Sequence, residues 1–198
     1  MLKRAFDIVF SAGWLIGFAP LLLFVAILVR LKLGSPVLFV QERPGLRAKP
    51  FRMVKFRTMT DARGPDGELL PDEQRLTPFG SFLRASSLDE FPEMWNVLLG
   101  DMSVVGPRPL LLRYVPRYSP FQARRMEVKP GVTGWAQVNG RSAIDWDEKF
   151  ALDVWYVDHR TFWLDMKIVF MTFFKVLARS GINSGEGKTV EEFRGTRR

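Results

Sequence analysis

The feature that most constrains this chain is a run of 22 residues without a charged side chain, from position 8 to position 29. A straight helix rises about 1.5 Å per residue, so such a run could cross a hydrocarbon core of about 30 Å. Pro20 divides the run, because an interior proline removes a helical hydrogen bond and clashes with the carbonyl of Ile16. Each arm then has only about 10–12 residues, too few to span a bilayer alone.

Basic residues flank both ends of this apolar run, with Lys3 and Arg4 before it and Arg30 and Lys32 after it. The positive-inside rule therefore places both ends on the cytoplasmic side. A kinked helix that enters the membrane and returns satisfies both observations, and a kinked spanning helix stays open as the alternative. No small-residue cleavage site follows the run, which argues against a cleaved signal peptide.

The composition narrows the chemistry and the partners. The chain has no cysteine and one histidine, His159, which excludes thiolate metal sites, cysteine nucleophiles and polyhistidine metal sites. Its net charge is +8, and residues 1–60 hold ten Lys and Arg against two acids. Because the excess charge surrounds the apolar run, it favours anionic membrane lipids over nucleic acid as the partner.

Periodicity and turn signals predict an α+β fold, a mainly helical cytoplasmic body with a short β-hairpin. The hairpin strands are expected at 37–41 and 51–59, a third strand at 102–105, and loops at 61–75 and 129–141. Helices are expected at 78–86, 87–99, 120–128, 146–158 and 161–179, and the charges in the last favour an amphipathic interfacial helix or a core helix over a span. We expect a re-entrant membrane helix in residues 1–34, a catalytic domain with interfacial helices in 35–181, and a mobile tail in 182–198.

Two adjacent acids, Asp89 and Glu90, lie in the stretch SSLDEFPEMW at 86–95. Ser87 followed three residues later by Glu90 fits a capping box, so a purely structural role is the simpler interpretation. The alternative is a catalytic pair, since a carboxylate can act as a nucleophile toward phosphorus and Mg²⁺ prefers oxygen ligands. Basic residues suited to phosphate are Lys55 in a strand, Arg84, and Arg108 and Arg141 in Pro/Gly loops.

The stretches LDEFPEMWNVLLGDMSVVGPRPLL (88–111) and KPGVTGWAQVNGR (129–141), with QERPGL and KFRTM, decide between these interpretations. They closely resemble the bacterial sugar transferases, the small monotopic phosphoglycosyl transferases of the PglC (bacillosamine-phosphate transferase) type. The resemblance extends from the first helix to about residue 185. It implies an enzyme at the cytoplasmic face of the bacterial inner membrane that begins a glycoconjugate pathway. This enzyme moves a sugar 1-phosphate from a UDP-sugar to polyprenol (undecaprenyl) phosphate and releases UMP.

The resemblance also implies roles for individual residues. The first acid of the LDE motif is the family's nucleophile, here Asp89, and the second, Glu90, assists at Mg²⁺ or as acid and base. The implied metal ligands are thus Asp89 and Glu90. The remaining matches are the phosphate-binding positions Lys55, Arg84, Arg108 and Arg141, the nearby acid Asp165, and the membrane kink at Pro20. Relatives often carry serine before that proline, where this chain has Ala19, which leaves the kink without a supporting hydroxyl.

Two other functions stay open at this point. A polyprenol-diphosphate hydrolase could use the same acids, and a non-catalytic membrane-anchored interaction module would need only the kinked helix and the basic segment. Further expected partners are a second copy of the chain or downstream glycosyltransferases. An N-acetylated or diacetamido sugar is the expected donor type, but no residue identifies the sugar.

Overall fold

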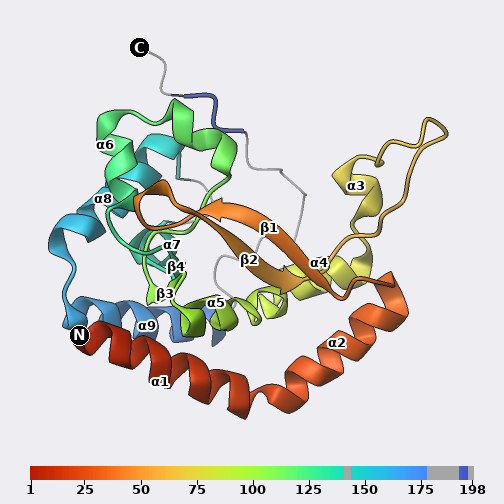
Figure 1. The fold of residues 1–198 in the computed structure, drawn as a ribbon, viewed down its shortest axis with the longest axis horizontal. Coiled ribbons are helices and arrows are strands. Elements are labelled where there is room, and N and C mark those ends of the chain that lie inside the picture. Colours follow the sequence, from red (N-terminus) through yellow and green to blue (C-terminus); the bar gives the residue numbers. More distant parts are fainter. Residues whose placement is uncertain (141–143, 178–191, 196–198) are drawn as a thin grey trace.

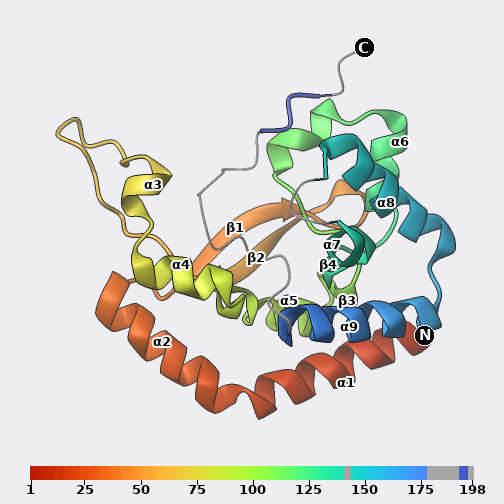
Figure 2. The same ribbon diagram turned by 180° about the vertical axis from the view of Figure 1, so that it is seen from behind.

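The computed structural model describes residues 1–140, 144–177 and 192–195 (Figure 1). It confirms a mainly helical α+β fold with two small sheets. Helices α1 and α2 form a wide V along one side of the molecule, and α9 lies next to α1 on the same side. The view from behind gives the same arrangement (Figure 2).

Helices α1 (Leu2–Gly17) and α2 (Ala19–Leu33) divide the apolar run at Phe18, where the helix axis bends by 62°. Pro20 occupies the first turn of α2, where its missing N–H and fixed φ are tolerated, so the proline begins a helix rather than interrupting one. In the described residues no single helix has the length and hydropathy to cross a membrane, whereas this bent pair meets both criteria together. The bend expected at Pro20 is therefore present, and it fits a broken span or a re-entrant loop.

The start of α1 is tied to the body by polar side chains. Arg4 donates to the carbonyls of Val97 and Leu98 at 2.7 and 2.8 Å, and so satisfies the C-terminal end of α5 (Glu93–Leu99). Asp7 is 3% exposed, and its Oδ1 accepts 3.0 Å hydrogen bonds from the Ser103 hydroxyl and the Val104 N–H. These contacts fix α1 against the strand β3 (Ser103–Val105).

The hairpin consists of β1 (Leu38–Pro44) and β2 (Pro50–Phe56), which pair antiparallel with Val40 opposite Val54. A short 3₁₀ turn (Leu46–Ala48) connects them. On β2 the side chains of Phe51 and Met53 are buried. Because alternate residues of a strand share one face, Lys55 lies on the same inward face. The predicted hairpin is confirmed with boundaries shifted by up to three residues.

The second sheet pairs β3 with β4 (Gly131–Thr133) in parallel. The remaining α-helices are α3 (Asp72–Arg75), α4 (Pro78–Ala85), α6 (Pro120–Ala123), α7 (Trp135–Asn139), α8 (Trp146–His159) and α9 (Phe162–Leu177). Further 3₁₀ turns span Leu88–Glu90, Leu112–Arg117 and Arg124–Met126. The expectation that 61–75 and 129–141 are loops is wrong in part, because the first contains α3 and the second contains β4 and α7.

Residues 192–195, which we expected within a mobile tail, contact the body. Phe193 is 2% exposed and packs its ring against Tyr114, Tyr118, Trp146 and Phe150, with centroid distances of 5.1–5.8 Å. The Phe193 carbonyl also accepts a 2.5 Å hydrogen bond from a guanidinium on the 112–117 turn. The rest of the expected tail lies outside the described residues.

Candidate active site

The two adjacent acids lie in the 3₁₀ turn Leu88–Glu90, ahead of helix α5. The predicted capping box is wrong: Ser87 has a left-handed backbone (φ 55°) and its side chain makes no capping hydrogen bond. Pro92 lies between the turn and α5, and a proline is tolerated before the first helical hydrogen bonds but not within them. The helix therefore begins at Glu93, and Gly100 ends it in the left-handed conformation, as predicted.

Glu90 is held by two basic side chains from other elements. Arg108 contacts both carboxylate oxygens, with its Nη1 3.1 Å from Oε2 and its Nη2 on Oε1, and Lys55 Nζ lies 2.9 Å from Oε1. Burial opposes ionisation of Glu90, but Arg108 and Lys55 outweigh it and lower its pKa to about 2. Glu90 is thus a fixed anion in this site.

Glu93 is a third acid that the sequence analysis did not single out. It is 1% exposed, and its Oε1 lies 2.9 Å from Lys55 Nζ, so this ammonium bridges Glu90 and Glu93. Burial, followed by the neighbouring Glu90, raises the pKa of Glu93. Its position three residues after Glu90 could have identified it from the sequence, since residues at this spacing can face the same partner.

Asp89 differs from both neighbours because, among the described residues, no hydrogen bond or ion pair reaches its carboxylate. It is 7% exposed. Burial and the adjacent Glu90 raise the pKa of Asp89 to about 6, although Lys55, Arg108 and Arg84 act in the opposite direction. The site therefore holds a buried carboxylate near cations with its oxygens available to a ligand.

The loop that carries Arg108 is fixed from two sides. Gly106 lies so close to residues 129–131 that a Cβ on it would come within 2.4 Å of the Lys129 carbonyl, which explains glycine there. From the other side, Arg125 Nη2 donates to the Arg108 carbonyl at 2.7 Å and to Asp153 at 2.7 Å. The side chains of Arg125 and Asp153 are each 2% exposed. The guanidinium of Arg108 thus projects from a rigid backbone.

The structure brings together four of the predicted residues: Asp89 and Glu90 with Lys55 and Arg108. Arg84 is exposed on α4, donates to the Thr58 hydroxyl at 3.0 Å, and acts electrostatically on Asp89. Arg141 lies outside the described residues, so its role stays a prediction.

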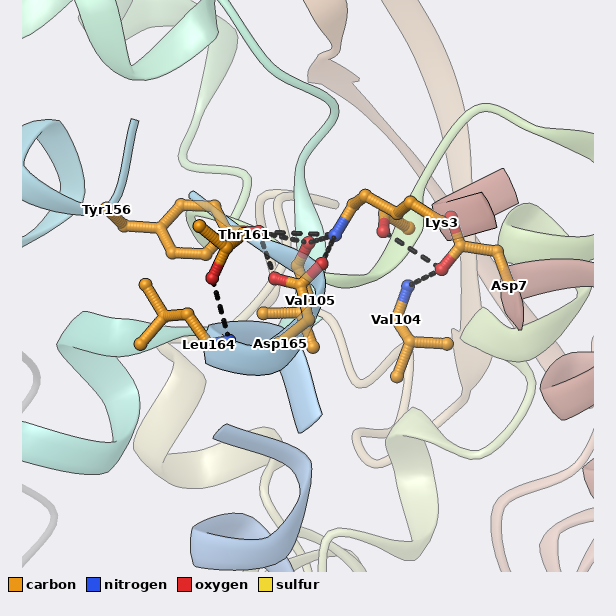
Figure 3. Close-up of polar contacts among 9 residues, drawn as sticks. Lys3, Asp7, Val104, Val105, Tyr156, Thr161, Leu164 and Asp165 are labelled. Carbon is orange, nitrogen blue, oxygen red and sulfur yellow. Dashed lines mark hydrogen bonds and ion pairs between the residues drawn. The ribbon is translucent and has the colours of Figure 1, made fainter. Parts of the chain in front are cut away.

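Asp165 belongs to a separate polar cluster at the start of α9 (Figure 3). Its Oδ2 lies 2.6 Å from Lys3 Nζ, and its Oδ1 accepts a 2.6 Å hydrogen bond from the Tyr156 hydroxyl. Lys3 also donates to the Val105 carbonyl at 3.0 Å. The predicted phosphate-site role of Asp165 stays a prediction, and its observed contacts join α1, β3, α8 and α9.

Asp89 and Glu90 are the ligands that the resemblance implies for Mg²⁺. In the residues that the structure describes, no group of three His, Cys, Asp or Glu side chains could hold a metal ion. Both oxygens of Glu90 are taken by Arg108, and one also by Lys55, whereas those of Asp89 have no such contact within the part of the chain that the structure describes. This donor set fits a magnesium ion held by one carboxylate together with substrate phosphates, the usual manner for Mg²⁺.

A cavity of about 250 Å³ adjoins the acids. Lys55, Glu93 and Arg108 line it on the side of the acids, and Arg43, Tyr114, Trp146 and Lys149 are among the other lining residues. Four of these side chains are basic and one is acidic, so the cavity suits an anion.

A bent pair of apolar helices thus accompanies a carboxylate site rich in cations, an arrangement that suits a phosphorylated ligand. Residues 1–179 match the model of the family described as bacterial sugar transferase, and the chain belongs to this family. The family predicted from the motifs is thereby confirmed, whereas the narrower PglC type stays a prediction.

Similar proteins extend this assignment. The chain is 55% identical over 196 residues to the uncharacterized sugar transferase EpsL of Bacillus subtilis, covering 99% of this chain and 97% of EpsL. It is 40% identical over 185 residues to the UDP-glucose:undecaprenyl-phosphate glucose-1-phosphate transferase of Escherichia coli, and 38% over 197 residues to the undecaprenyl-phosphate galactose phosphotransferase of Salmonella typhimurium. These matches cover 88% and 91% of this chain but only 40% and 41% of those two relatives.

Proposed function

We propose that the protein transfers a sugar 1-phosphate from a UDP-sugar to polyprenol phosphate, releasing UMP. The observation that carries this proposal is Asp89, a buried carboxylate that has no polar partner among the described residues, next to a cation pair that fixes Glu90. The names of the Escherichia coli and Salmonella typhimurium relatives support the substrate classes.

The proposed reaction has two steps at the sugar-bound phosphorus. An Asp89 oxygen attacks this phosphorus, the bond to the bridging oxygen breaks, and UMP leaves with the bonding electron pair. A phosphate oxygen of the polyprenol phosphate then attacks the same phosphorus, and the bond to Asp89 breaks. A carboxylate with a pKa of about 6 is ionised at neutral pH and available for this attack.

The neighbouring groups take supporting roles in this proposal. Arg108 and Lys55 place positive charge where the diphosphate develops negative charge, and Glu90 keeps both cations in position. Arg84 and Arg141 are proposed to bind phosphate oxygens. Mg²⁺, bound through the diphosphate and Asp89, would neutralise charge on the leaving UMP, and Glu90 as a second ligand would first have to exchange its present partners.

We further propose that α1 and α2 enter one leaflet of the bacterial inner membrane and return to the cytoplasmic face. Both ends of the pair contact the same body: Lys3 and Arg4 bind near β3 and α5, and the Arg57 side chain donates to the Ser35 carbonyl just after α2. Exposed apolar side chains lie along α1, α2 and α9, including Ile16 (77%), Phe24 (58%) and Trp163 (80%). A surface of this kind fits acyl chains and headgroups.

The test is to mix purified protein with Mg²⁺, a panel of UDP-sugars and undecaprenyl phosphate, and to assay for UMP and for the lipid-linked sugar. The proposal predicts equal amounts of both with one donor, and none with Asp89→Asn. A separate incubation with a polyprenol diphosphate tests the hydrolase, because release of inorganic phosphate together with polyprenol monophosphate would favour that function. If no product formed with any donor, the proposed transfer would be contradicted and a non-catalytic interaction module would be favoured.

A further inference from the structure

The cavity next to the acids is lined by four basic side chains and one acidic side chain, so its positive charge is only partly neutralised. Lys55 and Arg108 are shared with Glu90 and Glu93, as described above. The other two basic side chains come from separate elements, Arg43 from β1 and Lys149 from α8.

Neither Arg43 nor Lys149 has an ion pair with a carboxylate among the described residues. Arg43 donates to the neutral amide oxygen of Gln41 at 2.6 Å, and its buried Nε has no hydrogen-bond partner in residues 1–140, 144–177 and 192–195. Lys149 Nζ lies 4.9 Å from the ring centroid of Trp146, and burial lowers the pKa of this lysine to about 8. Two desolvated cations facing one cavity favour an anionic ligand.

One wall of the same cavity is aromatic. Tyr114 and Trp146 meet edge to face, with ring centroids 5.9 Å apart. Phe193 packs behind both rings at 5.8 and 5.5 Å and keeps them in place. Rigid aromatic rings beside a cationic pocket suit a planar base attached to phosphate, because every base offers a π-face for stacking.

We propose that this cavity binds the nucleotide half of the sugar donor, with its phosphates between Arg43, Arg108 and Lys149 and its base against Tyr114 and Trp146. The identity of the nucleotide rests on the proposed function. Arg108 and Lys55 line the cavity and also contact Glu90, so a diphosphate held here extends toward Asp89 from this side. Arg43 and Lys149 are therefore binding residues that the acid-centred motifs do not contain.

The experiment is calorimetric titration of UMP into the detergent-solubilised full chain. We expect Arg43→Gln and Lys149→Gln each to weaken UMP binding about tenfold or more, since each removes a charge-assisted contact with the phosphate. Arg43→Lys and Lys149→Arg keep the charge and should recover part of the affinity. The matched controls are Arg47→Gln and Lys49→Gln, whose side chains are exposed on the hairpin turn and should leave binding unchanged.

Uridine, which lacks the phosphate, should bind at least tenfold more weakly than UMP. Absence of UMP binding by the unaltered protein, or unchanged affinity in well-folded Arg43→Gln and Lys149→Gln variants, would overturn the assignment of the cavity. Product formation is measured separately. A protein that binds UMP through this cavity but makes no lipid-linked sugar would contradict the proposed function and support the nucleotide site.

Discussion

Lys3 Nζ and Asp165 Oδ2 lie 2.6 Å apart and join the first turn of α1 to the first turn of α9 (Figure 3). The Asp165 side chain is 4% exposed, and the Tyr156 hydroxyl donates to its second oxygen. The basic flank that the sequence analysis assigned to membrane orientation is thus also used within the protein. This contact keeps the chain start beside the body.

Loss of this ion pair should destabilise the protein. Lys3→Met removes the partner of a buried carboxylate, and Asp165→Asn removes its charge. Because the Lys3 side chain is 38% exposed and solvent screens the pair, we expect a coupling free energy of about 0.5–2 kcal/mol in a double-mutant cycle of denaturant unfolding. The exposed pair Arg113–Glu192, with side chains 61% and 42% exposed, is the control and should give less. Additive effects of Lys3→Met and Asp165→Asn would show that the contact contributes nothing.

The re-entrant arrangement predicts where the chain can be labelled. The chain has no cysteine, so single cysteines at the exposed positions 2 and 49 give clean probes. Both ends of the bent pair contact one body, and we therefore expect a membrane-impermeant thiol reagent to label neither cysteine in sealed cells and both after lysis. Labelling of position 2 alone in sealed cells would identify a spanning segment and contradict the re-entrant proposal.

The ionised Asp89 carboxylate should lower the free energy of unfolding. Its pKa of about 6 lies above the unfolded value of about 3.9, so the folded state holds the proton more tightly, and stability falls as pH rises from about 4 to about 6. Two pKa units correspond to about 3 kcal/mol, and we expect Asp89→Asn to stabilise the protein by about 1–3 kcal/mol at pH 7.5 while abolishing turnover. Thermal unfolding at pH 4 and pH 7.5 measures this difference. If the unaltered protein and Asp89→Asn were equally stable at pH 7.5, burial would not raise the pKa of Asp89.

The contribution of Arg108 to turnover should depend on its forked guanidinium rather than on its charge alone. Arg108→Lys keeps the charge but loses simultaneous contact with both oxygens of Glu90, so we expect turnover to fall by about 10- to 100-fold with little change in secondary structure. Arg47→Lys, exposed on the hairpin turn, is the matched control. Initial rates of UMP release measure the effect, and a fully active Arg108→Lys variant would reduce Arg108 to a general source of positive charge.

The sequence predicted those features that depend on local rules. The bend near Pro20, the hairpin and the end of α5 at Gly100 follow from proline geometry, alternation and glycine conformation, and the grouping of Asp89, Glu90, Lys55 and Arg108 follows from the motif chemistry and the family resemblance. The 3₁₀ turn at the acids escaped prediction because Ser87 adopts a left-handed backbone that only the surrounding packing can impose. Local propensity favoured a helix start there.

Features formed by residues far apart in the chain could not be predicted. The parallel pairing of β3 with β4 joins segments about 28 residues apart, and three-residue strands carry too little pattern to reveal it. Likewise, Phe193 meets Tyr114 across about 80 positions, and Arg43 meets Lys149 at the cavity across more than 100. Nothing in the neighbouring sequence marks such partners.

The central claim is that Asp89 forms a covalent bond to the sugar phosphate, and intact-protein mass spectrometry tests it most directly. The protein is incubated with Mg²⁺ and the UDP-sugar that supports turnover, without polyprenol phosphate, and quenched rapidly. We predict a mass increase equal to one sugar phosphate, its location on Asp89 by peptide fragmentation, and its disappearance when polyprenol phosphate is added. An unmodified protein under conditions of full turnover, or an adduct that persists in Asp89→Asn, would contradict the account.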